Sequence, residues 1–160
     1  MTIFHGSTDV VDVPRIIVSY TGRDFGTGFY TIDIEEQAAR WAKRQSAYRK
    51  KDTAILNTYE LNDSAFEILR VKSFIGYTLE WLDFVISCRK NVSFKHEYDL
   101  VIGKIANDDV GETIQAVLDG LTSKDFALSR LVFMKANNQI CFSTETALQH
   151  LKFISSERVY

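Results

Sequence analysis

The chain has 160 residues, of which 46% are hydrophobic, and its 21 acidic and 19 basic side chains give a formal net charge of −2. This length and apolar content suffice for one core without disulfide bonds, so we expect a single domain over residues 1–160. The composition excludes a membrane-spanning chain, because no apolar run approaches about 20 residues and no secretion signal is recognisable. We therefore expect a cytoplasmic protein without a membrane partner.

The first quarter of the chain is predicted to be mostly extended or irregular. A short strand is expected at residues 3–4, and an irregular stretch rich in turn-forming residues at 7–23. A second extended segment at 29–32 precedes a helix. Asp33 and Glu36 have the spacing of an acidic capping box for this helix. Its core-facing side is predicted from four residues that recur at helical spacing, Ile34, Ala38, Trp41 and Ala42.

The rest of the chain is predicted to mix strands and helices without strict alternation. Two strands at residues 54–61 and 66–71, separated by a turn signal at 62–64, suggest a hairpin. The further elements expected are helices near 79–86, 110–118 and 124–134, a short helix capped by Thr144, and strands at 98–102, 139–142 and 153–154. This order favours the α+β class over a doubly wound sheet.

Six of the nineteen basic residues lie in one short window. They are Arg40, Lys43, Arg44, Arg49, Lys50 and Lys51. Our first interpretation is a solvated helix face whose last turn is cationic and complements the helix dipole. The alternative interpretation is a contact with phosphate groups or RNA.

Most catalytic signatures are absent from the sequence. There is no Walker loop and no Gly-x-Ser-x-Gly motif, and Gly22, Gly26 and Gly28 precede an extended segment, whereas a Rossmann fingerprint opens a helix. The two cysteines, Cys88 and Cys141, and the three histidines lack the spacing of metal ligands, so no metal site is expected.

Three short segments suit the binding of a planar ligand that carries phosphate. In the first, His5 can hydrogen-bond a sugar hydroxyl, and Gly6 lets the backbone approach a ligand. In the second, two glycines permit a tight bend with positive φ before Tyr30, whose ring can stack on an aromatic ring. The segments are residues 5–7, 24–30 and 137–139.

With these segments the chain resembles the His-Tyr-Glu class of ADP-ribosyltransferases, the class of diphtheria toxin and the poly(ADP-ribose) polymerases. It is more similar still to an uncharacterised bacterial family that is catalogued as a domain of unknown function and regarded as a divergent member of that superfamily. The matching stretches are residues 5–7, 24–30, 37–38, 41–42, 81–85, 98–103 and 138–142. The resemblance implies an α+β fold with an ADP-ribosyltransferase-like split β-sheet core and surrounding helices, and NAD as substrate.

The resemblance also assigns roles to individual residues. His5 would hold the ribose beside the nicotinamide, Gly6 would pair with the carboxamide through its backbone, and Tyr30 would stack on the nicotinamide ring. Trp41 would complete a sandwich, although core packing is the favoured interpretation of an aromatic residue at helical spacing. The implied NAD-binding set is His5, Gly6, Ser7, Gly28, Tyr30 and Trp41, and the implied catalytic set is His5, Tyr30 and Gln139.

Gln139 departs from the pattern of the class, which places a glutamate at this position. A glutamine keeps the hydrogen bond to the ribose but loses the charge that stabilises an oxocarbenium-like centre, and it cannot act as a general base. Glu145 and Glu112 are alternative carboxylates, but each also has a sufficient structural role near the start of a helix.

The resemblance implies an enzyme that cleaves the nicotinamide–ribose bond of NAD and transfers ADP-ribose to a protein or nucleic acid. A bacterial intracellular toxin or defence effector, neutralised by an antitoxin-like partner, is the expected setting. Two alternatives stay open. One is an NAD glycohydrolase, and the other is a catalytically weak module that binds NAD or an ADP-ribosylated partner because Gln139 replaces the usual glutamate. The sequence identifies neither the acceptor nor the oligomeric state.

Overall fold

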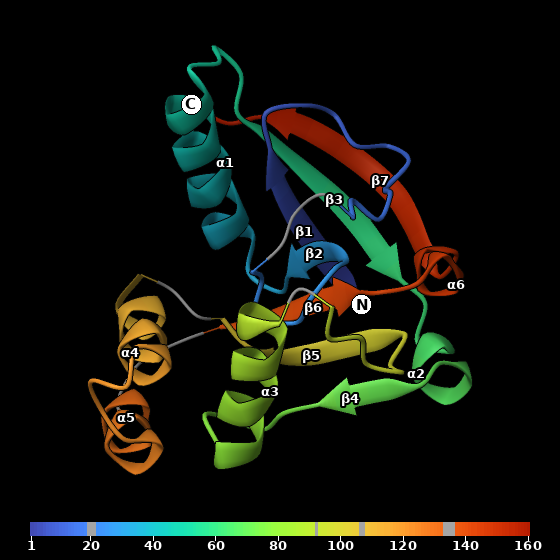
Figure 1. Cartoon of the computed structure of the whole chain (residues 1–160). Helices are drawn as coiled ribbons and strands as arrows, with labels where there is room; N and C mark the ends of the chain where they lie inside the picture. The colour runs from blue at the N-terminus through green and yellow to red at the C-terminus, as the bar shows by residue number, and fades with distance from the viewer. Residues whose placement is uncertain (19–21, 92, 106–107, 133–136) are drawn as a thin grey trace.

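A computed structural model describes residues 1–18, 22–91, 93–105, 108–132 and 137–160 (Figure 1). Strands and helices are interspersed along this part of the chain. The elements in chain order are β1 (Thr2–Ser7), β2 (Phe29–Ile32), α1 (Glu35–Arg49), β3 (Ile55–Leu61), α2 (Ala65–Ile68), β4 (Val71–Ser73), α3 (Leu79–Lys90), β5 (Leu100–Lys104), α4 (Asp108–Leu118), α5 (Lys124–Leu131), β6 (Asn138–Phe142), α6 (Glu145–Leu148) and β7 (Leu151–Arg158).

The strands form one seven-stranded sheet in the order β4-β5-β6-β2-β1-β3-β7. Only β4 and β5 are parallel among the described pairs, and the other neighbours are antiparallel. The ladder narrows between β1 and β2, which share the single register pair Phe4↔Ile32. On one side of this junction lie β1, β3 and β7. Their direction is steeply inclined to that of β4, β5 and β6 on the other side (Figure 1). The predicted α+β class is confirmed. The split expected in the β-sheet corresponds to this narrowing, because the strands on both sides of it belong to one hydrogen-bonded sheet.

The sheet around β5 and β6 is buried on both faces, because alternate residues of a strand point to opposite sides. Ile140 and Phe142 belong to one core cluster together with Ile3 and Tyr59. Cys141, between them in the strand, belongs to a second cluster that includes side chains of α3, α4 and α5. Helix α3 lies over this half of the sheet and contacts α4 and α5 beside it, whereas α1 packs on β1 in the other half (Figure 1).

Helix α1 differs from its prediction at its start and on its surface. The cap position is Ile34, no side chain caps the helix, and Glu35 is its first residue, so the capping box expected at Asp33 is wrong. Ala38 and Ala42 are buried as predicted. Ile34 and Trp41, however, are 38% and 49% exposed, so half of the predicted core-facing side lies at the surface.

The hairpin predicted after β3 is also wrong. Residues 65–68 form the short helix α2, and the next strand, β4, starts at Val71 and pairs with β5 instead of β3. The β-branched and aromatic residues of this stretch gave a strand signal, but β3 already has β1 and β7 as its neighbours. Tertiary pairing therefore overrides the local β-propensity here.

The remaining elements lie close to their predicted positions. The strand predicted at 98–102 is β5, which begins two residues later and includes Gly103 instead of ending before it. The helix predicted at 124–134 is α5, which ends at Leu131, and residues 133–136 lie outside the described part of the chain. Thr144 caps α6 as predicted, since its hydroxyl accepts a hydrogen bond from the Ala147 amide at 3.2 Å.

Candidate functional site

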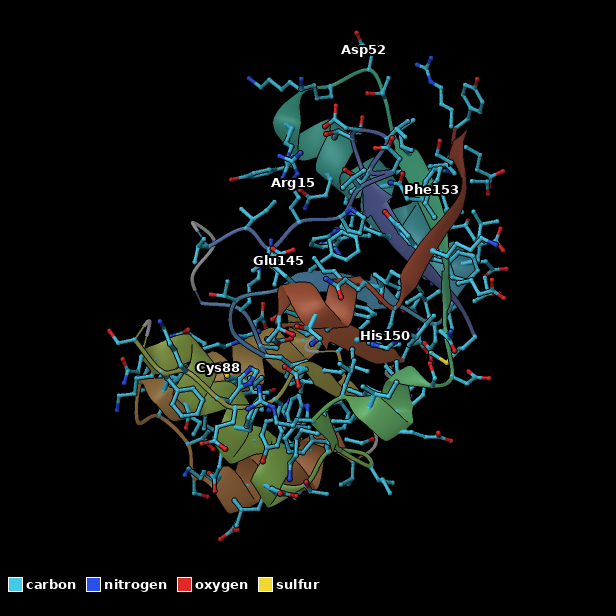
Figure 2. All side chains as sticks on the ribbon, turned by 90° about the vertical axis from the view of Figure 1, so that its right-hand side faces the viewer. Arg15, Asp52, Cys88, Glu145, His150 and Phe153 are labelled. Carbon is cyan, nitrogen blue, oxygen red and sulfur yellow. The ribbon has the colours of Figure 1, made fainter. Side chains whose placement is uncertain are left out.

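A cavity of about 1090 Å³ lies where β1 and β2 diverge, and α1 forms one of its walls. Residues between 11 and 17 also line the cavity, among them Arg15, which lies in the same half of the molecule as α1 (Figure 2). All the residues that the sequence placed in the site line this one cavity. They are His5, Gly6, Ser7, Gly28, Tyr30, Trp41 and Gln139. The structure thus brings together segments that are more than one hundred residues apart.

His5 bridges the junction between the two halves of the sheet. If the register at Phe4↔Ile32 continued, Gly6 would pair with Tyr30, but the strands separate. The Nδ1 atom of His5 lies 2.7 Å from the carbonyl oxygen of Tyr30 instead. A carbonyl only accepts hydrogen bonds, so Nδ1 carries the proton and the Nε2 atom of the neutral ring is an acceptor.

The His5 imidazole is uncharged over most of the pH range in which the protein would work. Burial lowers its pKa to about 4, and the nearby guanidinium groups of Arg23 and Arg49 act in the same direction, against the hydrogen bond to Tyr30. Removing a histidine from water disfavours its charged form, because the imidazolium loses its hydration. The site therefore offers a neutral acceptor nitrogen at neutral pH.

Tyr30 holds the bend that precedes its own strand. Its hydroxyl donates a hydrogen bond to the Gly26 carbonyl at 2.6 Å and accepts one from the Phe25 amide at 3.1 Å. Burial raises the pKa of this phenol well above its ordinary value, so the hydroxyl is protonated. Gly26 has the predicted positive φ, at +77°. One face of the Tyr30 ring meets the guanidinium of Arg23, whose central carbon lies 5.1 Å from the ring centroid.

Gly6 and Gly28 serve close packing rather than a positive φ. A Cβ atom at Gly28 would clash with the Cys141 sulfur and lie 2.7 Å from the Phe142 carbonyl oxygen. A Cβ atom at Gly6 would clash with the Ala38 carbonyl and lie 2.8 Å from the Ala42 amide nitrogen. The predicted bend therefore takes its positive φ from Gly26 and its close packing from Gly28. Gly6 permits α1 to approach β1 closely, and this packs the cavity wall against the His5 strand.

Gln139 is buried and bonded to a carboxylate that the sequence did not single out. Its Nε2 atom donates to the Oδ2 atom of Asp24 at 2.8 Å, and both residues are only 8% exposed. The other carboxylate oxygen, Oδ1, accepts hydrogen bonds from Nε and Nη2 of Arg89 at 2.8 and 2.5 Å. All three side chains line the cavity. Asp24 lies two residues before Gly26, in a segment that the sequence analysis selected for its glycines. This position is the sequence signal that could have identified Asp24 as a site residue.

Trp41 lines the cavity and is 49% exposed, so the favoured interpretation of core packing is wrong. The central carbon of the Arg44 guanidinium lies 5.9 Å from the centroid of its indole ring. The basic window around it divides into two parts. Arg40, Arg44 and Arg49 line the cavity, whereas Lys43, Lys50 and Lys51 are exposed outside it.

The alternative carboxylates do not reach the site. Glu145 is the exposed first residue of α6, and Glu112 is an exposed residue of α4. Neither lines the cavity, in contrast to Asp24. Ser7 does line it, and the Ser7 hydroxyl accepts a hydrogen bond from the Asp9 amide at 3.2 Å.

The amino-acid sequence matches the family described as "Protein of unknown function (DUF3990)" over residues 1–153. The chain belongs to this family. Comparisons with curated proteins and with solved structures found no match. Within the described ranges, no helix of this chain is long and apolar enough to cross a membrane. The same ranges contain no group of three or more His, Cys, Asp or Glu side chains arranged to hold a metal ion.

Proposed function

We propose that this chain is an NAD-dependent ADP-ribosyltransferase that cleaves the nicotinamide–ribose bond and transfers ADP-ribose to a macromolecule. The observation that carries the proposal is the meeting of His5 and Tyr30 at the divergence of β1 and β2, on the wall of one large cavity. The volume of about 1090 Å³ is slightly above the usual range for ligand pockets, which leaves room for an extended dinucleotide.

The site chemistry matches the parts of NAD. The neutral Nε2 atom of His5 would accept a hydrogen bond from a ribose hydroxyl, and the Tyr30 ring would stack on the nicotinamide. Arg23, which now covers Tyr30, and the arginines of α1 would bind the pyrophosphate through paired N–H groups. Nicotinamide would thus take the place of the Arg23 guanidinium on the ring.

In the proposed reaction the C1′–N bond breaks and its electron pair leaves with nicotinamide. A nucleophilic group of the acceptor then bonds to C1′, and its proton passes to water in the open cavity. Gln139 would hold the ribose 2′-hydroxyl through its Oε1 atom, since its amide nitrogen is bonded to Asp24. The negative charge of Asp24, transmitted through the polarised amide, would take over part of the role of the missing glutamate.

A catalytically weak NAD-binding module is the second candidate, and one observation favours it. Arg89 forms an ion pair with Asp24, in which the two side chains are 20% and 10% exposed, respectively. This cation neutralises much of the charge that would stabilise an oxocarbenium-like centre. A glycohydrolase, with water as acceptor, is the third candidate and differs from the first only in its product.

The proposal is tested with labelled NAD, the purified protein and a cell extract as the source of acceptors. We expect release of nicotinamide and transfer of label, both lost in a His5→Ala/Tyr30→Ala variant. A matched control is His150→Ala/Tyr160→Ala, which removes the same two residue types outside the cavity. If the two double variants release nicotinamide equally, or if the wild type releases none, the enzymatic proposal fails.

Product analysis separates the three candidates. Label on a macromolecule supports the transferase, and free ADP-ribose alone supports the glycohydrolase. Binding of NAD measured by calorimetry without turnover supports the module. The proposed role as a toxin is tested by induced expression in a bacterium, where growth arrest should require His5 and Tyr30 and should be relieved by a neutralising partner.

A further inference from the structure

One face of α1 lines the cavity over most of the length of the helix. The residues of this face are Arg40, Trp41, Arg44, Gln45, Tyr48 and Arg49, preceded by Gln37 one turn earlier. They are spaced three and four apart, which places them side by side on one surface of a helix. Arginines and aromatic residues therefore alternate along a single wall.

The aromatic residues of this wall are not core residues. Trp41 is 49% exposed and Tyr48 is 85% exposed. They lie seven residues apart, which corresponds to about 10 Å along a helix. Arg44 lies between them in the sequence, with its guanidinium over the Trp41 ring. Two large rings are thus exposed on the wall of a cationic cavity, where they can stack on planar groups.

The cationic charge of the cavity exceeds what a dinucleotide requires. Among the described residues that line it, six are arginines and two are aspartates, although the whole chain has a net charge of −2. The pyrophosphate of NAD presents two phosphates, and one arginine can bind a phosphate in a bidentate manner. The three arginines of α1 and Arg15 exceed those phosphates in number. A longer chain of phosphates fits this surplus.

We infer that the α1 wall binds a single-stranded nucleic acid, with phosphates on Arg40, Arg44 and Arg49 and bases stacked on Trp41 and Tyr48. A cationic groove with aromatic platforms is the usual means of binding single strands, because unpaired bases expose a ring face that a duplex hides. The further step, that the bound strand is the acceptor of ADP-ribose, rests on the proposed function. DNA and RNA both present phosphates and unpaired bases, and binding to oligonucleotides of each kind distinguishes them.

The test uses fluorescent oligonucleotides of DNA and RNA, each single-stranded and as a duplex, with anisotropy measured at several salt concentrations. Two triple variants of the whole chain remove three positive charges each. Arg40→Gln/Arg44→Gln/Arg49→Gln changes the cavity wall, and Lys43→Gln/Lys50→Gln/Lys51→Gln changes the exposed remainder of the same basic window.

We expect the arginine variant to bind a single strand at least tenfold more weakly and to lower the log–log salt slope by about 2, since each lost phosphate contact removes roughly 0.7. The lysine variant should bind nearly as the wild type does. The inference is overturned if both variants lose affinity equally, if the wild type binds no oligonucleotide, or if it prefers the duplex. Equal competition by polyglutamate, which has charge but no bases, would also overturn it in favour of an acidic protein partner.

Aromatic variants separate stacking from charge. Trp41→Ala and Tyr48→Ala should each weaken single-strand binding about tenfold, as expected for the loss of one stacked base. Phe126→Ala is the control, because Phe126 is a 56% exposed aromatic residue on α5 that does not line the cavity. An unchanged affinity in both of the first two variants would contradict the stacking that the inference requires.

The inference and the proposed function fail separately. Nicotinamide release is measured without oligonucleotide, and oligonucleotide binding is measured without NAD. Release without strand binding overturns the inference and leaves the enzyme intact, whereas strand binding without release does the opposite. Label from NAD on the oligonucleotide, present in the wild type and in the lysine variant, supports both.

Discussion

Asp24 changes what Gln139 can contribute, because the two buried side chains share a hydrogen bond of 2.8 Å. A carboxylate accepts hydrogen bonds only, so the amide nitrogen must face Asp24 and the amide oxygen is directed elsewhere. The single variant Gln139→Glu, which introduces the glutamate of the class that the chain resembles, would place two carboxylates against each other. At such a distance one of them would be protonated at neutral pH.

We therefore predict that the exchange variant Asp24→Asn/Gln139→Glu is more active than either single variant. The exchange keeps one negative charge and one hydrogen bond but moves the charge to residue 139, which is proposed to face the ribose. Asp24→Asn alone should lower nicotinamide release about tenfold and destabilise the fold by about 2 kcal/mol, since it leaves the partly buried Arg89 without its counter-ion. Initial rates and urea unfolding measure the two effects. An exchange variant that is slower than both single variants would contradict the role given to Asp24.

His5 links the stability of the protein to pH. Its pKa is lowered from 6.5 to about 4 on folding, mainly by burial, so the unfolded state binds a proton first as the pH falls. The stability that neutral His5 contributes is therefore fully present above pH 6.5 and is lost progressively as the pH falls toward 4. The Asp99 carboxylate, whose pKa is lowered to about 2 mainly by the Arg70 hydrogen bonds, contributes stability that is lost only at lower pH.

The expected result is a free energy of unfolding that falls by about 2 kcal/mol between pH values of about 7 and 4.5, from 1.36 kcal/mol per pKa unit reduced for partial exposure. His5→Gln should remove most of this dependence. Urea unfolding at several pH values gives the measurement. If the wild type and the variant lose stability in parallel, His5 is not the group that titrates.

At the scale of elements, the contact of α1 with β1 depends on Gly6. Ala38 and Ala42 meet this glycine on the inner side of the helix, while Trp41 and Arg44 lie on the cavity side. The close approach of α1 to β1 thus packs the inner side of the helix into the core and places its arginines along the cavity. A shift of α1 would alter both.

Gly6→Ala should destabilise the fold by about 3 kcal/mol, because the added methyl group meets backbone atoms of α1 that cannot give way. The control is Gly111→Ala within α4, where an added Cβ atom meets nothing within 4 Å. This change should stabilise the protein by about 0.5 to 1 kcal/mol through helix propensity. Thermal or urea unfolding compares the two, and equal effects would disprove the packing role of Gly6.

At the scale of the whole molecule, the two halves of the sheet meet at one register pair and the cavity spans this junction. A ligand that contacts residues of β1, β2 and α1 together binds only when the halves are correctly placed. Its binding energy is therefore added to the stability of the whole fold.

We predict that NAD at about 100 times its Kd adds about 2.7 kcal/mol and raises Tm by about 5 to 11 °C in a chain of this size. Differential scanning fluorimetry with increasing NAD measures the shift. His5→Ala/Tyr30→Ala should abolish the shift, whereas His150→Ala/Tyr160→Ala should keep it. An equal shift in both variants would show that NAD binds elsewhere.

The sequence by itself determined the elements whose signals are local. The segment 29–32, the helix that starts at Leu79 and the Thr144 cap were predicted closely, because alternation, helical spacing and capping act over a few residues. It also selected the glycine-rich segment and the histidine that now line one cavity. The hairpin at 66–71 failed since strand pairing depends on neighbours that are distant in the chain.

Only the tertiary structure decided which side of α1 is exposed and which carboxylate meets Gln139. Trp41 and Ala38 both recur at the helical spacing of the predicted core-facing side. The close approach of β1 through Gly6 buries Ala38, whereas Trp41 stays 49% exposed. Asp24 and Gln139 are 115 residues apart, and no local pattern encodes their hydrogen bond. The physical reason is that such contacts follow from the packing of whole elements, whereas sequence patterns report only the periodicity within each element.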